Sequence, residues 1–118
     1  MDKVRIKEVI VVEGRDDTAA VQKAVDALII ETHGFGISKE TWKLLTKAYE
    51  EKGLIIMTDP DFSGEEIRKR ISEKFPKSKH VYMPRKKAKK GNDIGIENST
   101  PEDIAEALRK ISFTRETE

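Results

Sequence analysis

The chain has 118 residues, no cysteine, and 23 Lys and Arg residues against 22 Asp and Glu residues, a formal charge of +1. This length predicts one domain over residues 1–118, with its core over about 6–111 and a frayed tail over 112–118. The absence of cysteine excludes disulfides, thiolate metal sites and a cysteine nucleophile. We expect a cytoplasmic protein with no membrane partner, because neither a long apolar run nor a secretion signal is present.

The near-neutral total hides two regions of opposite charge. Residues 68–90 contain eleven basic side chains and one acid, a net +10, whereas the rest of the chain carries −9. Such a basic segment binds polyanions or remains solvated. We predict that these residues contact nucleic-acid phosphates, together with one arginine near the N-terminus: Arg15, Arg68, Arg85, Lys86, Lys87, Lys89 and Lys90.

The first part of the chain predicts two strands and a helix. Residues 8–12 form a short β-branched apolar run, typical of a strand that is buried on both faces. A helix follows over about 18–25, and Asp16 and Asp17 are expected to serve its cap and first turn. Residues 27–30 predict a second strand.

The middle of the chain predicts a second helix and a third buried strand. Ser38 is a plausible N-cap for a helix that runs through Trp42 and Leu45, with Gly53 as the residue that ends it. Trp42 has helical spacing from Leu45, so we expect it to pack in the core. Residues 54–58 predict the third strand.

The last part of the chain predicts a turn, two helices and a short strand. A turn is expected over 59–64, followed by a helix over about 65–75 and a strand over 80–83. A long basic loop is expected over 85–99. Thr100 is the expected N-cap of the final helix, with proline at its first helical position.

The alternation of strands and helices predicts an α/β fold. We expect three layers: a mostly parallel four-stranded sheet with helices on both faces, in a Rossmann-like arrangement. Ligands of such sheets bind beyond the carboxyl ends of the strands. The side chains that follow each strand are therefore the first candidates for a functional site.

Three carboxylates follow two of the predicted strands. Glu13 directly follows the first strand, and Asp59 and Asp61 directly follow the third. If these strands are neighbours, the three acids converge at one edge of the sheet, where their repulsion favours a hard divalent cation such as Mg²⁺. The cation would neutralise a phosphate and orient it for attack.

Each of these residues also has a simpler interpretation. Aspartate is common in turns and helix caps, so Asp59 could serve only as such a residue. Asp17 is most simply a first-turn residue, although Asp17 is also a further candidate metal ligand. Gly14 and Gly64 could be ordinary turn glycines or could let a ligand approach the backbone. Two aromatic residues, Phe62 and Tyr82, could stack on bases, but the sequence alone does not favour that role.

The motifs that carry these residues resemble a known domain. The stretches Val-Val-Glu-Gly-Arg-Asp-Asp at 11–17 and Ile-Ile-Met-Thr-Asp-Pro-Asp at 55–61, with Gly64, resemble the toprim domain of topoisomerases, bacterial primases and several nucleases. Within that family the chain most resembles the ribonucleases that mature 5S ribosomal RNA, which share the Gly-Ile-Glu stretch at 95–97. The resemblance covers about residues 6–110.

The resemblance implies a metal-dependent endoribonuclease. Glu13 would be the general acid/base and lie close to the metal, while Asp59 and Asp61 would hold Mg²⁺, for which Mn²⁺ could substitute. The implied substrate is structured or double-stranded RNA, with a 5S rRNA precursor as the expected partner. The resembling nucleases carry a further C-terminal domain for RNA recognition, so a ribosomal protein or a separate RNA-binding subunit is a second expected partner.

Two other hypotheses compete with the nuclease. The first is a toprim module that binds nucleic acid or a protein without cutting it. The second is a phosphorylated receiver domain, in which Asp16, Asp17 and Asp59 would form the acidic site. The receiver is disfavoured because only four strands are predicted instead of five, and because Asp61 would have no role.

Overall fold

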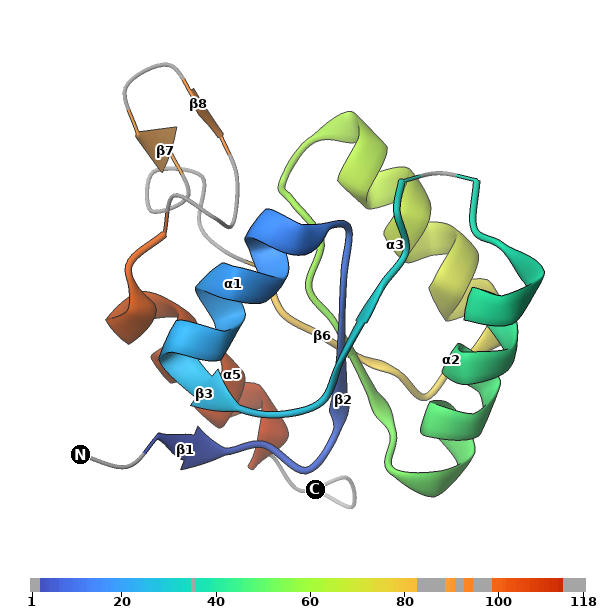
Figure 1. The fold of residues 1–118 in the computed structure, drawn as a ribbon, viewed down its shortest axis with the longest axis horizontal. Helices are drawn as coiled ribbons and strands as arrows, with labels where there is room; N and C mark the ends of the chain where they lie inside the picture. The colour runs from blue at the N-terminus through green and yellow to red at the C-terminus, as the bar shows by residue number, and fades with distance from the viewer. Residues whose placement is uncertain (1–2, 35, 83–88, 91–92, 95–98, 114–118) are drawn as a thin grey trace.

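A parallel sheet forms the centre of the molecule (Figure 1). The computed structural model describes residues 3–34, 36–82, 89–90, 93–94 and 99–113. Within these residues the main sheet has four strands in the order β4–β2–β5–β6, all parallel. Its strands are β2 (Val9–Val12), β4 (Ile29–Glu31), β5 (Leu54–Ile56) and β6 (Lys79–His80).

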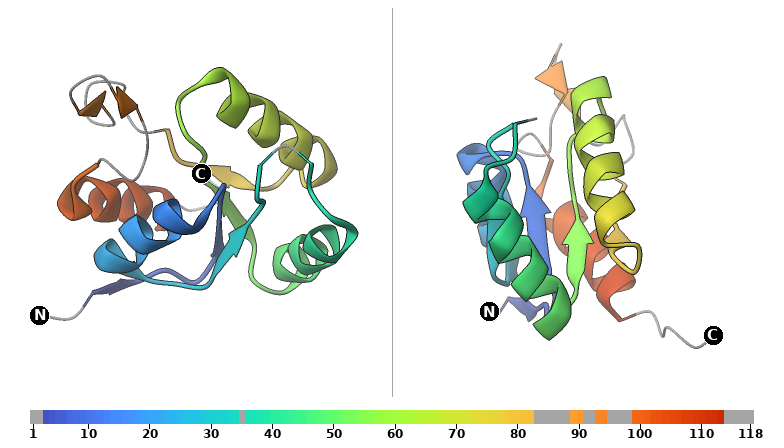
Figure 2. Two further views of the ribbon diagram at one scale, coloured as in Figure 1. Left: turned by 45° about the horizontal axis from the view of Figure 1, so that its top comes forward. Right: turned by 90° about the vertical axis from the view of Figure 1, so that its right-hand side faces the viewer.

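Helices cover both faces of this sheet, which confirms the predicted three-layer fold (Figure 2). One core cluster joins the sheet to α1 and α5, and a second joins it to α2 and α3. Ile10 and Val12 belong to the first cluster, and Val9 and Val11 belong to the second. The helices are α1 (Arg15–Ala24), α2 (Lys39–Glu51), α3 (Phe62–Lys74) and α5 (Pro101–Ser112).

The predicted helix ends are largely confirmed. The Ser38 side chain accepts a hydrogen bond from the backbone N–H of Thr41 at 3.1 Å, and Thr100 caps α5 in the same way. Gly53 follows α2 with φ +86°, a left-handed conformation that favours glycine. Trp42 packs against Phe75 in the α2–α3 core, as expected.

Other predicted boundaries were wrong. The helix α3 begins at Phe62 instead of Glu65, because Asp61 caps it and ends the expected turn three residues early. The expected loop over 85–99 contains an antiparallel pair, β7 (Lys89–Lys90) and β8 (Asp93–Ile94). A second small sheet that the sequence did not predict pairs β1 (Val4–Arg5) with β3 (Val25–Asp26).

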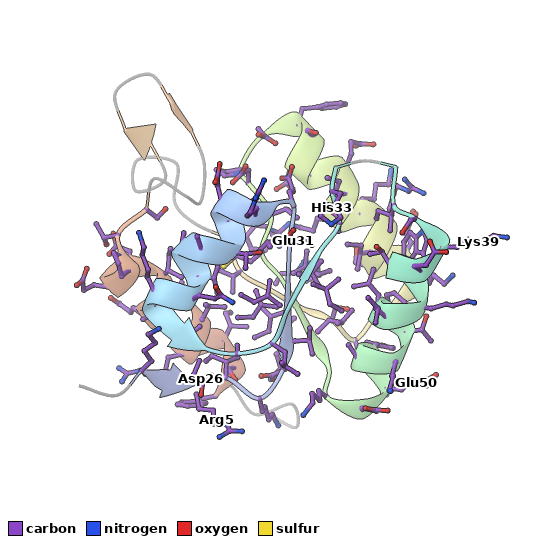
Figure 3. All side chains as sticks on the ribbon, in the orientation of Figure 1. Arg5, Asp26, Glu31, His33, Lys39 and Glu50 are labelled. Carbon is purple, nitrogen blue, oxygen red and sulfur yellow. The ribbon has the colours of Figure 1, made fainter. Side chains whose placement is uncertain are left out.

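Side chains fill the space between the sheet and its helices (Figure 3). Among the helices that the structure describes, none is long and apolar enough to pass through a bilayer. A groove of about 460 Å³ runs along the outer edge of β4, where Glu31 and His33 lie close together. Neither Glu13 nor the two aspartates after β5 line this groove.

Candidate active site

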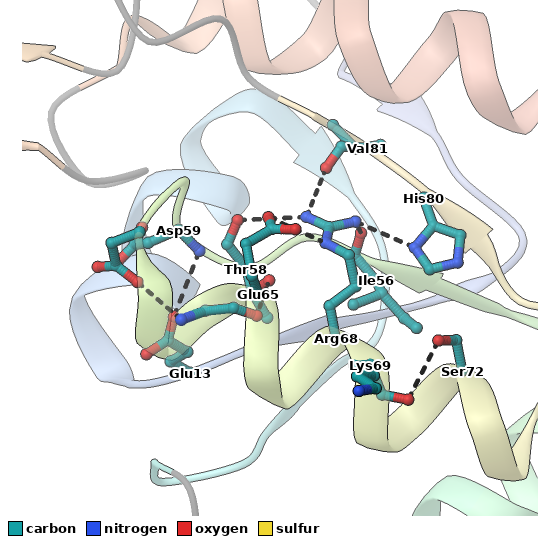
Figure 4. A network of polar contacts seen from close by, with 12 residues as sticks. Glu13, Ile56, Thr58, Asp59, Glu65, Arg68, Lys69, Ser72, His80 and Val81 are labelled. Atoms are coloured by element: carbon teal, nitrogen blue, oxygen red, sulfur yellow. Dashed lines mark hydrogen bonds and ion pairs between the residues drawn. The ribbon is translucent and has the colours of Figure 1, made fainter.

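The two strands that carry the predicted acids are neighbours, as the hypothesis required. β2 pairs with β5 in parallel, with Val11 opposite Ile56. Glu13 and Asp59 therefore follow adjacent strands at the same edge of the sheet. The Glu13 side chain is half-buried there, and its Oε1 accepts a hydrogen bond from the backbone N–H of Asp59 at 3.3 Å (Figure 4).

Asp61 begins the next helix. Its Oδ1 accepts a hydrogen bond from the backbone N–H of Gly64 at 2.7 Å, which makes it the N-cap of α3. An acid at this position is stabilised by the exposed N–H groups and by the helix dipole. The carboxylate that was predicted to hold a metal thus also has a structural role.

Gly64 is required by close packing. A Cβ atom at this position would lie 2.2 Å from the carbonyl oxygen of Asp59, far inside van der Waals contact. The first turn of α3 can therefore press against the Asp59 backbone only because residue 64 has no side chain. The sequence suggested that Gly64 lets a ligand come close to the backbone. In the structure, it is the Asp59 backbone that comes close to Gly64.

Gly14 occupies a different environment. It is the N-cap of α1 in an extended conformation, and a Cβ atom there would meet nothing within 4 Å. Its backbone N–H donates to Oδ2 of Asp17 at 3.2 Å. Asp17 is thus a buried first-turn residue that closes the start of α1, and its role as a metal ligand stays a prediction.

Electrostatics at this edge disfavour negative charge. Burial raises the pKa of Glu13, and repulsion by Asp59 and Asp61 raises it further, although the hydrogen bond from the Asp59 backbone acts in the opposite direction. In the part of the chain that the structure describes, no three His, Cys, Asp or Glu side chains are gathered closely enough to hold a metal ion. One ion shared by Glu13, Asp59 and Asp61 stays a prediction.

The predicted phosphate contacts fall into four groups. Arg15 is exposed in the first turn of α1, two residues after Glu13. The backbones of Lys89 and Lys90 form β7, whereas Arg85, Lys86 and Lys87 lie outside the described residues. Arg68 is the fourth case and needs a correction.

Arg68 is not placed to contact RNA. Only 4 % of the residue is exposed, because it lies on the same helical face as Gly64, Ile67 and Ile71, which are also buried. Its guanidinium donates to backbone carbonyls at the ends of β5 and β6. The spacing of positions 64, 67, 68 and 71 along a helix is the signal that could have revealed this burial.

Comparison with known proteins agrees with the predicted family. The Toprim domain model matches residues 8–90. The chain is 51 % identical to ribonuclease M5 of Fusobacterium nucleatum over 113 residues, and 47 % identical to ribonuclease M5 of Bacillus subtilis over 110 residues. These matches cover 95 % and 92 % of this chain but 62 % and 59 % of the relatives. The chain thus spans about 60 % of their length.

A solved structure gives the same result. The small TOPRIM domain protein from Bacillus stearothermophilus superposes with a TM-score of 0.72 at 26 % sequence identity, over 90 % of this chain and 86 % of that one. The receiver hypothesis receives no support, since the main sheet in the described residues has four strands. By its sequence, its sheet and the acids at its strand ends, the chain belongs to the toprim domain family.

Proposed function

We propose that the chain is a Mg²⁺-dependent endoribonuclease that cuts structured precursor rRNA, as in the maturation of 5S rRNA. The observation that carries the proposal is the contact between Glu13 and the Asp59 backbone, which brings the acids of two adjacent strands to one edge. The identity of about 50 % with ribonucleases M5 supports the reaction and the substrate class. A cytoplasmic location and a single domain over residues 1–118 remain predictions.

The donors at this edge suit a hard divalent cation, and the toprim family implies dependence on such a metal. Glu13, Asp59 and Asp61 offer only carboxylate oxygens, which are the ligands that Mg²⁺ takes in proteins. Burial, with added repulsion from Asp59 and Asp61, raises the pKa of Glu13, and a bound cation would offset this unfavourable negative charge. Bound there, Mg²⁺ would supply electrostatic stabilisation of the charge that develops on the scissile phosphate.

Glu13 is the proposed general acid/base. A raised pKa brings a carboxyl group closer to the pH at which it can both accept and release a proton. The Asp59 backbone N–H occupies Oε1, so we assign proton transfer to Oε2. The same hydrogen bond orients the side chain toward the Asp59 turn.

The proposed RNA contacts are sequence-independent. Arg15 would bind a backbone phosphate close to Glu13, and the Lys89–Lys90 strand would extend the contact along the RNA. Arg85, Lys86 and Lys87 complete the predicted surface. A ribosomal protein or a separate RNA-binding subunit, as predicted from the sequence, could add further contacts.

The test compares the cleavage of a 5S precursor stem by Glu13→Gln and by Asp16→Asn in the presence of Mg²⁺. Both variants remove one acid close to the start of α1, but Asp16 is exposed and has no proposed role in the reaction. We expect Glu13→Gln to lower cleavage by at least about a hundredfold while RNA binding persists, and Asp16→Asn to cleave like the wild type. Binding without cleavage by the wild-type chain would instead identify a non-catalytic toprim module.

A further inference from the structure

Arg68 organises the ends of two strands (Figure 4). Its Nη1 donates to the carbonyl of Ile56 at 3.1 Å and contacts Nδ1 of His80 at 3.1 Å. Burial lowers the pKa of His80, and the Arg68 charge lowers it further, which favours the neutral imidazole beside the guanidinium. Such a buried cation must be held by several acceptors, and these come from β5 and β6.

One nitrogen of this guanidinium joins the active-site edge to the end of β6. Nη2 of Arg68 donates to the carbonyl of Val81 at 2.9 Å and to that of Thr58 at 3.4 Å. Thr58 directly precedes Asp59, and Val81 directly precedes Tyr82. The Arg68 guanidinium therefore links the residue before Tyr82 to the residue before a proposed metal ligand.

The Tyr82 ring packs against Arg68 and His80 but remains largely exposed. The guanidinium carbon of Arg68 lies 4.2 Å from the ring centroid, and His80 lies beside the ring at 5.9 Å with an interplanar angle of 17°. Even so, 64 % of Tyr82 is exposed. The contacts with Arg68 and His80 therefore leave most of Tyr82 accessible to a ligand.

Other exposed aromatics lack this support. Phe62 is 80 % exposed and Phe113 is 64 % exposed, but neither makes a ring or cation contact within the described residues. A ring that is fixed in orientation loses little freedom when a flat ligand stacks on it. Every nucleobase has such a flat face, and stacking on aromatic rings is tolerant of sequence.

We propose that Tyr82, backed by Arg68 and His80, is a stacking site for an unpaired nucleobase of the RNA whose phosphodiester reaches Asp59. This inference rests on the proposed function and names a contact within that same site. It also assigns a task to Arg68: a buried positioning residue that holds the aromatic ring beside the carboxylate edge. A base on Tyr82 would fix the position of the neighbouring phosphate relative to Asp59.

The test measures RNA binding without cleavage. The probe is an RNA stem-loop with one unpaired 2-aminopurine next to the stem, titrated with the full chain in EDTA. We expect Tyr82→Ala to weaken binding about 5- to 150-fold and to abolish the stacking-induced change in 2-aminopurine fluorescence. Tyr82→Phe keeps the ring and should restore both readouts to within about threefold of the wild type.

Phe113→Ala is the matched control, because Phe113 has the same exposed fraction as Tyr82 and follows α5 at the other end of the molecule. Phe113→Ala should bind the RNA with the wild-type affinity and give the wild-type change in 2-aminopurine fluorescence. An unchanged affinity and fluorescence response in Tyr82→Ala would overturn the proposal, as would an equal loss in Phe113→Ala. The measurement needs no catalysis, so a chain that fails to cleave would refute the proposed function and leave this test intact.

Discussion

The two ends of strand β2 carry the same residue type in opposite electrostatic states. Glu8 precedes the strand and Glu13 follows it. Glu8 is buried with a cation: its Oε2 accepts from Nζ of Lys79 at 2.8 Å, and its Oε1 accepts from Oγ of Ser112 at 2.7 Å. Glu13 faces two aspartates instead, and its Oε1 accepts a hydrogen bond from the neutral backbone N–H of Asp59.

The pKa values of the two glutamates move in opposite directions. Burial tends to raise the pKa of Glu8, but its hydrogen bonds with Lys79 and Ser112 outweigh burial and lower it. At Glu13, burial and the neighbouring aspartates together raise the pKa. Among the residues that the structure describes, Glu8 thus has a cationic partner in Lys79, whereas no cation contributes to the shifted pKa of Glu13.

The largest expected effect tests how closely α3 packs against the Asp59 backbone, at the end of β2 that carries Glu13. In Gly64→Ala the new Cβ would overlap the Asp59 carbonyl, so the helix start must shift and we expect a loss of about 3 kcal/mol in the free energy of unfolding. Chemical denaturation measures this value. Gly14→Ala is the control at the same end, where open space limits the loss to less than about 1 kcal/mol. Equal losses in the two variants would contradict the packing argument.

The next effect separates the two glutamates. Glu8→Gln removes a buried charge from its partners, and we expect it to lower the free energy of unfolding by about 2 kcal/mol at neutral pH. Glu13→Gln removes a charge that its surroundings disfavour, so stability should rise or stay unchanged. Denaturant titrations of both variants check these signs, and a destabilised Glu13→Gln would break the comparison.

Addition of Mg²⁺ should stabilise the protein through the end of β2 that carries Glu13, and not through the end that carries Glu8. At a concentration ten times the dissociation constant, a cation bound only to the folded state adds about 1.4 kcal/mol of stability. We expect Mg²⁺ to raise the melting temperature of the wild type and of Glu8→Gln, but not that of Glu13→Gln or Asp59→Asn. An equal rise in all four proteins would place the ion elsewhere.

The smallest effect is the dependence of these differences on pH. Glu8 has a lowered folded pKa, so its contribution is present above the ordinary value of 4.5 and is lost as pH falls through the folded pKa. Glu13 has a raised pKa, so its ionisation costs stability as pH rises from 4.5 through the folded pKa. The deficit of Glu8→Gln should shrink in acid without Mg²⁺, while any advantage of Glu13→Gln should grow toward neutral pH.

The sequence predicted the parts of the fold that follow from local patterns. The strand at 8–12 and the helix after Ser38 were visible because apolar spacing and caps are local signals. The β1–β3 pair was not, since two-residue strands are too short to show any periodicity. The pairing of β7 with β8 had one signal, the Gly91-Asn92 dipeptide between them, which is typical of hairpins.

The sequence predicted that acids of two strands lie at one edge of the sheet, but it did not predict the contacts around them. Glu13 and Asp59 were found because both follow apolar runs and because adjacent parallel strands end together. Arg68 was counted with the basic surface, although its charge points into the protein, because charge counting ignores the helical face on which a residue lies. The link between Tyr82 and Asp59 depends on a tertiary contact, which no local pattern contains.

The contact between Glu8 and Ser112 has a consequence for synthesis of the chain. The two residues are 104 positions apart, and Lys79 is 71 positions from Glu8. While the chain emerges from the ribosome, Glu8 has neither partner until most of the sequence has been translated. The turn at Asp59 and the start of α3 are joined by contacts across only a few residues. The Asp59 turn and the start of α3 can therefore become ordered early, whereas closure of the opposite end must wait for α5.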